Sequence, residues 1–374
     1  MSETKPKLKL SQNSKWLKQL MDGLFVIAGP CSAESEEQLL KTALALKEIP
    51  AVRVFRAGIW KPRTRPNSFE GVGVKGLKWL KNVKEKTGLA TAVEVANQSH
   101  VFEALKFGVD VLWIGARTTA NPFSVQEIAD ALQGVNIPVW VKNPVNPDLQ
   151  LWIGALERLN NAGIHRLGTI HRGFTTHERT PYRNAPKWQI PIELKRLVPD
   201  IPLICDPSHI AGSSQFLQEL SQKALDLTMT GLMIETHPNP ENALSDAKQQ
   251  ILPSALSELL RNLKMRSNDE SMSDDILAGL RRESNAVDYE LLEILSRRMD
   301  VVRRIGEYKK EHNLAILQVQ RWQEVIEDRL ETGDMLGLEK KFVKDIYEIL
   351  HSYAIKLQSA VMNVDQKTEV EISH

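Results

Sequence analysis

The sequence predicts a parallel (β/α)8 barrel over roughly residues 20–263, followed by an all-helical domain. Short runs rich in Val, Ile and Leu, bounded by Gly, Pro, Asn or Asp, recur along this region and alternate with segments of helical apolar spacing. Each run also ends near a charged or metal-binding side chain. An open doubly wound sheet is the alternative, but it usually carries a Gly-rich dinucleotide fingerprint, which this sequence lacks.

The expected strands are short enough to be buried on both faces, as strands of a parallel sheet usually are. They are Leu24–Ala28, Val52–Ala57, Ala90–Val95, Val109–Ile114, Ile137–Val141, His165–Ile170, Ile201–Cys205 and Gly231–Ile234. The expected helices between them include Glu37–Leu46, Gly76–Lys86, Val101–Phe107, Val125–Leu132, Leu149–Leu159 and Phe216–Ala224.

The composition limits the class of protein. A chain of 374 residues is long for one domain and suits two. The formal net charge of +1 argues against a nucleic-acid binder, so any basic site is local. Two cysteines, Cys31 and Cys205, fit a reducing compartment. The first residues contain no apolar signal core and no stretch is long enough to span a membrane, so we expect a cytoplasmic protein.

The residues that follow the strands predict where the active site lies. In a barrel, the carboxyl ends of all strands surround one mouth, where active sites are found. One polar strand end is ordinary, because exposure to solvent explains it, but a polar residue at every end indicates a site. The strand ends carry Cys31, Arg56 with Lys61, Glu94, Arg117, Lys142, His171 with Arg172, Asp206 with His209, and Glu235 with His237.

These side chains and one more carboxylate fall into two chemical sets. Cys31, His209, Glu235 and Asp246 combine soft and hard ligands, which suits a divalent metal ion of the Mn, Fe, Co or Zn class. Each also has a structural interpretation, as a buried thiol, a helix cap or half of a salt bridge. The other set is cationic and exceeds what one phosphate needs. It comprises Arg56, Lys61, Arg117, Lys142 and Arg172, with Arg63 and Thr64 available for a second phosphate.

Several motifs resemble those of 3-deoxy-D-arabino-heptulosonate 7-phosphate (DAHP) synthases of the short type I subfamily. They are GPCSAES, RAGIWKPRT, IGAR, VWVKNP, HRG, DPSH, IETHP and LSDAK, in that order. The resemblance implies a metal-dependent condensation of phosphoenolpyruvate with erythrose 4-phosphate. It implies that the metal ligands are Cys31, His209, Glu235 and Asp246. It places Arg56, Lys61, Arg117, Lys142 and Arg172 around phosphoenolpyruvate, Lys61, Arg63 and Thr64 toward erythrose 4-phosphate, and Ser208 near a phosphate.

The implied chemistry leaves two questions open. Lys61 would protonate the alkoxide formed when phosphoenolpyruvate attacks the aldehyde, or would act only electrostatically. Glu94 would orient a water molecule or a lysine. The alternative enzyme is 3-deoxy-D-manno-octulosonate 8-phosphate synthase, which resembles this barrel but has a KANRS-type segment where this chain has KPRT. Because that loop faces the aldose, we favour DAHP synthase.

The carboxyl-terminal part of the sequence predicts a separate helical domain. After a barrel domain of residues 1–263, the polar segment 264–275 is expected to be a linker. A helical domain would then occupy residues 276–363, and residues 364–374 would form a tail. The expected helices are Ile276 to about Glu311, Ala315–Leu330 and Leu338–Met362.

Two cations on the first of these helices have two possible interpretations. Arg298 and Lys309 lie in one stripe with apolar residues. Burying an unpaired cation is costly, so either these side chains reach water or an anionic ligand lies inside the bundle. Arg281 lies about 100° away from that stripe and would reach a partner's pocket. The apolar members of the stripe are Leu291, Leu295, Val302 and Ile305.

The segment LRRESNAVDYELLEILSRRMDVVRRIGEYKK resembles the first helix of the all-helical chorismate mutases, which are intertwined homodimers. The resemblance implies rearrangement of chorismate to prephenate. Arg298, Lys309, Arg321 and Gln358 would contact the ligand, Lys309 and Gln358 at the ether oxygen, and Arg281 would be contributed by the partner.

Three residues depart from the common mutase pattern. Gln318, Trp322 and Ala354 stand where Asp, Glu and Ser are frequent. A non-catalytic dimerisation and sensor module is therefore the alternative for this half. We also expect prephenate bound to the helical domain to inhibit the barrel. The barrel begins almost at once in the sequence, so we expect it to lack the amino-terminal regulatory domain that some relatives carry.

Overall fold

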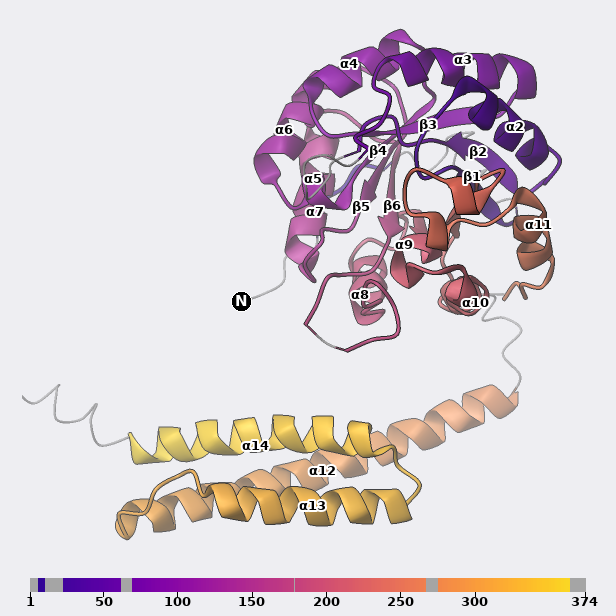
Figure 1. Ribbon diagram of the computed structural model, residues 1–374. Coiled ribbons are helices and arrows are strands. Elements are labelled where there is room, and N and C mark those ends of the chain that lie inside the picture. The colour runs from indigo at the N-terminus through magenta and orange to yellow at the C-terminus, as the bar shows by residue number, and fades with distance from the viewer. Residues whose placement is uncertain (1–5, 11–22, 62–68, 178, 267–274, 364–374) are drawn as a thin grey trace, which may run out of the picture. The chain divides into compact units, whose positions relative to one another are not determined.

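The computed structural model describes residues 6–10, 23–61, 69–177, 179–266 and 275–363. Internal contacts divide the chain into two compact units, Met1–Asn268 and Asp269–His374, which are described separately (Figure 1).

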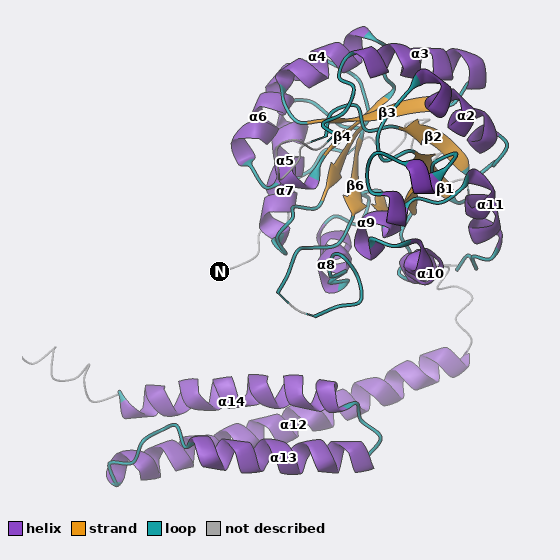
Figure 2. Ribbon diagram, viewed as in Figure 1, coloured by secondary structure: helices purple, strands orange, loops and turns teal. Residues whose placement is uncertain are grey.

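Eight parallel strands close into a barrel in the first unit (Figure 2). The predicted fold class is confirmed, and each expected strand lies within two residues of an observed one. Strands β4 to β7 begin later than expected because the apolar residues before them, such as Ile137 and Ile201, are buried in the approach to the strand. The strands are β1 (Phe25–Gly29), β2 (Val52–Arg56), β3 (Ala90–Val95), β4 (Val111–Ile114), β5 (Val139–Lys142), β6 (Leu167–His171), β7 (Leu203–Cys205) and β8 (Gly231–Glu235).

Helices surround the strands, and several begin at a residue whose side chain caps the first turn. Ser35 accepts a hydrogen bond from the Gln38 amide, and Asp148 accepts one from the Leu151 amide. The helices are α2 (Glu36–Lys47), α3 (Lys75–Thr87), α4 (Gln98–Lys106), α5 (Ala116–Thr119), α6 (Pro122–Ala131), α7 (Leu149–Asn161), α8 (Gln189–Leu197), α9 (Pro207–Ala211), α10 (Leu217–Asp226) and α11 (Pro253–Arg261). Three short 3-10 helices are η1 (Ser214–Phe216), η2 (Pro240–Asn242) and η3 (Ala247–Gln249).

The barrel has an inner and an outer apolar core. The inner one contains Phe25, Trp113, Trp140 and Met233. The rings of Phe25 and Trp140 stack with centroids 5.9 Å apart. The larger outer core lies between the strands and the helices. The inner layer therefore fills the barrel and leaves its two ends as places for a site.

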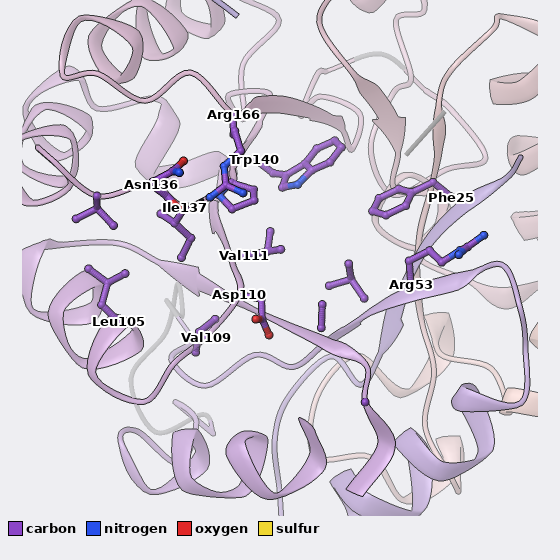
Figure 3. A pocket seen from close by; sticks show the side chains of 15 residues that line it. Phe25, Arg53, Leu105, Val109, Asp110, Val111, Asn136, Ile137, Trp140 and Arg166 are labelled. Atoms are coloured by element: carbon purple, nitrogen blue, oxygen red, sulfur yellow. Dashed lines mark hydrogen bonds between the residues drawn. The ribbon is translucent and has the colours of Figure 1, made fainter. Parts of the chain in front are cut away.

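A cavity of about 640 Å³ lies at the amino-terminal end of the strands (Figure 3). Its lining includes Phe25, Ala90 and Val111, each the first residue of its strand, together with Arg53 and Arg166. The cavity lies at the end of the barrel opposite the predicted mouth, and none of its lining residues is a predicted site residue.

The second unit contains three long helices, α12 (Asp275–Glu311), α13 (Val319–Met335) and α14 (Lys340–Met362), in which α14 packs against both others (Figure 1). The expectation that the middle helix begins at Ala315 is wrong. Asn313 has a left-handed φ of 51°, and the Lys309 ammonium donates a hydrogen bond to the Ile316 carbonyl oxygen at 2.6 Å. These features accompany a non-helical turn before Val319. Among the described residues, no helix is long and apolar enough to cross a membrane.

Candidate active site

The four predicted metal ligands form two close pairs at the carboxyl ends of the strands. The sulfur of Cys31 lies 3.2 Å from Oδ2 of Asp246, and Nε2 of His209 lies 3.7 Å from Oε1 of Glu235. Cys31 and Glu235 are fully buried, whereas His209 and Asp246 are about one-fifth exposed. Within the described residues, no group of three or more His, Cys, Asp and Glu side chains meets the geometry of a metal site.

The protonation of these groups follows from their surroundings. Burial, reinforced by the Glu235 carboxylate, raises the pKa of the Cys31 thiol to about 12. Burial also lowers the pKa of His209, which favours the neutral imidazole. Burial opposes ionisation of both carboxylates, but His209 and Arg56 lower the pKa of Glu235, and Arg183 holds that of Asp246 well below its usual range.

The side chain of Asp246 is not a helix cap, whereas that of Glu235 is half of a salt bridge. Asp246 precedes η3 but makes no capping hydrogen bond with its side chain, which instead contacts Cys31 and the Arg183 guanidinium. Glu235 does form a buried ion pair, with its Oε1 3.2 Å from Nη2 of Arg56. The backbone N–H of Cys31 donates to Gln250 at 3.0 Å, so the β1 and β8 loops are joined there.

Two predicted substrate cations contact the predicted metal ligands directly. Arg56 is 2 % exposed and, besides pairing with Glu235, lies over the ring of Trp113 at 5.0 Å. The Lys61 ammonium donates to the carbonyl oxygen of Cys31 at 2.7 Å and to its sulfur at 3.0 Å. Burial acts to lower the pKa of Lys61, but its contact with the Cys31 sulfur and the charge of Glu235 raise the pKa overall. Lys61 is therefore protonated at neutral pH.

Lys142 ends β5 and is held by a buried carboxylate. Its ammonium lies 2.8 Å from Oδ2 of Asp206 and 6.0 Å from the centroid of the Trp113 ring. The indole N–H of Trp113 donates to Glu94 at 3.0 Å. Trp113 therefore lies beneath both Arg56 and Lys142, and Glu94 is placed to orient that ring.

Further arginines gather where β4 and β6 end. Arg172 donates to the side-chain oxygen of Asn184 at 3.0 Å. Burial, together with the positive charges of Arg183 and Arg117, lowers the pKa of Arg172 to about 10 although Asp206 opposes the shift. Arg172 remains charged at neutral pH. Such mutual repulsion between cations is relieved when an anion binds among them.

The remaining predicted barrel residues have different surroundings. Ser208 is buried, and its hydroxyl accepts a hydrogen bond from the Glu235 amide at 3.0 Å, so it supports a predicted metal ligand. Arg63 and Thr64 lie outside the described residues. His171, the last residue of β6, is fully buried and packs against Phe174 and Trp188.

Sequence reasoning gave no role to Asn184 or Arg183. Both lie in the long connection between β6 and α8, where no periodicity marks them, and both reach the site. Asn184 donates to the backbone oxygen of His209 at 2.6 Å, and Arg183 lies 2.9 Å from Asp246. Asp206 was predicted to lie at the mouth because it follows a strand. Its contacts with Lys142 and His209 could not be predicted from the sequence.

The predicted ligand residues of the helical unit include several that are enclosed. Lys309 and Gln358 are each 8 % exposed. Within the described part of the chain, Nη1 of Arg298 and Oε1 of Gln358 are buried atoms that have no hydrogen-bond partner. Gly306 of α12 faces Gln358 so closely that an added Cβ would lie 3.2 Å from its Cγ. A buried donor and a buried acceptor without partners indicate a place for a polar ligand.

Two other predicted ligand residues are on the surface of this single chain. Arg321 pairs with Glu324 at 3.1 Å, and Arg281 is exposed. Trp322, where Glu is common, stacks on His351 with ring centroids 3.9 Å apart. The buried Ala354 lies one turn further along α14. The Trp322 and Ala354 departures therefore replace polar groups by a packed aromatic pair and a methyl group.

Comparison with known proteins matches the two units to two different families. The model of the "DAHP synthetase I family" matches residues 10–270, and that of "Chorismate mutase type II" matches residues 280–359. The phospho-2-dehydro-3-deoxyheptonate aldolase of Thermotoga maritima is 33 % identical over 244 residues, which cover 65 % of this chain and 70 % of that protein. The 2-dehydro-3-deoxyphosphooctonate aldolase of Legionella pneumophila is 28 % identical over 260 residues, covering 64 % and 90 %.

Solved structures agree with the DAHP synthetase match. The crystal structure of the Thermotoga maritima DAHP synthase superposes with a TM-score of 0.58 at 32 % identity, covering 64 % of this chain and 67 % of that one. A truncated form of the Thermotoga maritima enzyme gives 0.56 at 29 % identity, covering 64 % and 84 %. The chain therefore belongs to the DAHP synthetase I family and carries a chorismate mutase type II domain at its carboxyl-terminal side.

Proposed function

We propose that this chain catalyses two reactions, the condensation of phosphoenolpyruvate with erythrose 4-phosphate and the rearrangement of chorismate to prephenate. Membership of the two families supports both enzyme activities. The observation that carries the barrel assignment is the contact between the two chemical sets. Arg56 pairs with Glu235 at 3.2 Å, and Lys61 lies 3.0 Å from the sulfur of Cys31.

The ligand types and the spacing within each candidate pair suit a divalent ion, although no group of three or more described side chains meets the geometry of a metal site. Ligands at about 2.0–2.3 Å from a tetrahedral metal are separated from one another by roughly 3–4 Å, and the two observed pairs are 3.2 Å and 3.7 Å apart. Oε1 of Glu235 is buried and pairs with Arg56 at 3.2 Å, but it accepts no hydrogen bond from any described residue. Cys31, His209, Glu235 and Asp246 would hold the ion, and the thiol proton would be displaced. When bound, the ion would polarise the aldehyde of the sugar phosphate.

The cations would have separate roles in substrate binding and proton transfer. Arg56, Lys142 and Arg172, with Arg117 beside them, would bind the phosphate and carboxylate of phosphoenolpyruvate. Lys61, which stays protonated, would give a proton to the oxygen that becomes an alkoxide when the new carbon–carbon bond forms. The second phosphate would be bound by Arg63 and Thr64, with Ser208 supporting Glu235.

The comparisons favour DAHP synthase over the octulosonate 8-phosphate synthase. The matching family model is that of DAHP synthetases, and the heptonate aldolase relative is more similar than the octonate relatives, at 33 % against 27–28 % identity. The test supplies phosphoenolpyruvate with erythrose 4-phosphate or arabinose 5-phosphate, with and without a chelator. We expect turnover of erythrose 4-phosphate only, lost with the chelator and restored by divalent metal. Preference for arabinose 5-phosphate would contradict the assignment.

For the helical domain we propose clamping of chorismate in the conformer that rearranges. This reaction needs no acid, base or nucleophile, so positioning and electrostatic stabilisation are sufficient. Arg298 and Arg321 would bind carboxylates, and Lys309 and Gln358 would contact the ether oxygen, where negative charge develops. The support for this site is the pair of buried unpartnered atoms on Arg298 and Gln358.

We further propose that two chains associate through the helical domain, with Arg281 completing the partner's pocket. The helix α12 has 37 residues and is about 55 Å long at 1.5 Å per residue. It exposes large apolar side chains, including Val287 at 58 % and Leu292 at 61 %, which a second copy would cover. We also propose that prephenate bound in this domain inhibits the barrel. Both reactions would take place in the cytoplasm.

A further inference from the structure

Two buried residues, Asp206 and Asn184, contact His209. Asp206 makes two of the contacts: its Oδ1 accepts the backbone N–H of His209 at 3.1 Å, and its Oδ2 lies 2.7 Å from Nδ1 of the ring. Asn184 makes the third, donating from its side-chain nitrogen to the His209 carbonyl oxygen at 2.6 Å. The ring and both backbone polar groups of one candidate metal ligand are therefore fixed.

The two holding residues are themselves fixed by predicted substrate cations. Asp206 is fully buried and lies 2.8 Å from the Lys142 ammonium. Asn184 is 4 % exposed and accepts from Arg172 at 3.0 Å. These contacts join strands β5, β6 and β7 and the connection after β6. His209 thus cannot shift without disturbing buried polar groups on several elements.

The arrangement determines which ring nitrogen is available. Because Nδ1 of His209 faces the Asp206 carboxylate, the ring hydrogen belongs on Nδ1, and Nε2 keeps its lone pair. Nε2 is also the atom that faces Glu235 Oε1 at 3.7 Å. We propose that Asp206 and Asn184 are positioning residues that orient His209 so that Nε2 binds the divalent metal. This inference rests on the proposed metal site.

The isosteric change Asp206→Asn tests the ring contact sharply. Three groups face Asp206: the Lys142 ammonium and the His209 amide donate hydrogen bonds to it, and Nδ1 of the His209 ring lies 2.7 Å from its Oδ2. A carboxylate accepts from all three. An amide has one oxygen and one NH2 group, so in either orientation a donor faces a donor. The Asn184→Ala change tests the backbone contact independently, because it removes only the hydrogen bonds of that side chain.

Each variant has a matched control elsewhere in the barrel. Asp110 is 31 % exposed, lies 2.6 Å from the Lys84 ammonium and accepts from the Thr91 amide at 2.9 Å, so Asp110→Asn removes a carboxylate with similar partners. Asn160 is 7 % exposed and donates to the carbonyl oxygens of Lys9 and Ile164, so Asn160→Ala removes a comparable buried amide. Neither control residue contacts a candidate metal ligand.

The experiment titrates the full-length metal-free proteins with Co²⁺ alone and follows the thiolate-to-metal charge-transfer absorption. We expect Asp206→Asn and Asn184→Ala each to weaken Co²⁺ binding by about 10–100-fold. At saturating Co²⁺ both variants should still show the full charge-transfer absorption, because Cys31 is unchanged. The two control variants should bind Co²⁺ within about twofold of the parent. Circular dichroism would verify that each protein is folded.

The outcomes separate this inference from the metal site on which it rests. A parent protein without a saturable charge-transfer band would overturn the proposed metal site itself. A parent that binds Co²⁺, with both site variants binding equally well, would overturn only the positioning role. An equal loss in the controls would also overturn it, since the effect would then be general destabilisation. If Asp206→Asn does not fold, Asn184→Ala decides alone.

Discussion

The sulfur of Cys31 lies 3.2 Å from a carboxylate oxygen of Asp246, although 215 positions separate the two residues in the sequence. Cys31 follows the first strand of the barrel and Asp246 follows the last. The Lys61 ammonium, 3.0 Å from the same sulfur, brings the predicted substrate loop to this point. The contact therefore joins the candidate metal ligands to the candidate catalytic lysine.

The Cys31→Ala variant should abolish the condensation and leave the mutase active. The change removes the one sulfur ligand from a fully buried position, while the substituted methyl group fits in the same space. Both activities would be measured on the same preparation, by consumption of phosphoenolpyruvate and of chorismate. Equal loss of both would indicate misfolding. Full retention of condensation would show that the sulfur is dispensable.

The Arg298→Ala variant should lower the mutase kcat by about 10²–10³-fold, the range for loss of one preorganised donor. The reason is that its buried Nη1 has no protein partner among the described residues and is available to a ligand. Arg303→Ala, on the same helix, is the control because that guanidinium is half exposed and pairs with Asp300. A parent that binds prephenate but never forms it would favour the sensor module instead.

Prephenate should inhibit the condensation at concentrations that fill the helical site. A ligand can shift an equilibrium between two arrangements of the chain only if it binds one of them better. The measurement is the rate of phosphoenolpyruvate consumption against prephenate concentration, in the parent and in Arg298→Ala. Inhibition should need more prephenate in the variant. Unchanged condensation at saturating prephenate would disprove the regulatory proposal.

His171 should make the barrel less stable as the pH falls. Burial, together with the charge of Arg172, lowers its pKa to about 3, so the folded protein keeps the ring neutral while the unfolded chain takes up a proton near pH 6.5. Its contribution to the free energy of unfolding is therefore complete above about pH 6.5 and is lost toward pH 3. The slope from this group is at most about 1.4 kcal/mol per pH unit.

Urea unfolding at several pH values would measure this effect. His171→Phe should give a shallower fall in the free energy of unfolding between pH 6.5 and 4.5 than the parent, because the phenyl ring cannot be protonated. His177→Phe, at an exposed position, should leave the slope unchanged. Parallel curves for the parent and His171→Phe would mean that the buried ring takes up its proton without cost.

The sequence predicted the barrel well because its signals are local and repeated. Each strand is a short apolar run, and the polar residue at its end must lie at the mouth once the barrel closes. This reasoning placed Arg56, Lys142, His209 and Glu235 at one end of the barrel, and their mutual contacts agree with that placement. The candidate roles of these residues in metal and substrate binding stay predictions.

The features that the sequence could not predict depend on side chains from distant segments. Asn184 lies in an irregular connection, and nothing in the local pattern indicates that it reaches both Arg172 and His209. The short helix α9 was not among the expected helices, because it begins with Asp206 and Pro207, which are typical of both a turn and a helix start. The start of α13 was placed too early because Lys309 binds a carbonyl oxygen in the preceding turn.

The pairing of β1 with β8 has a consequence for how this enzyme matures. Gly29 is the register partner of Glu235, so Cys31 and Glu235 stand on either side of the seam that turns a curved sheet into a closed ring. During synthesis the thiol emerges about two hundred residues before the carboxylate, and contacts over such separations form late. A ribosome-bound chain that ends before β8 could fold its first helices, but it would lack part of the candidate metal-binding set. Catalytic competence would then report that the ring has closed.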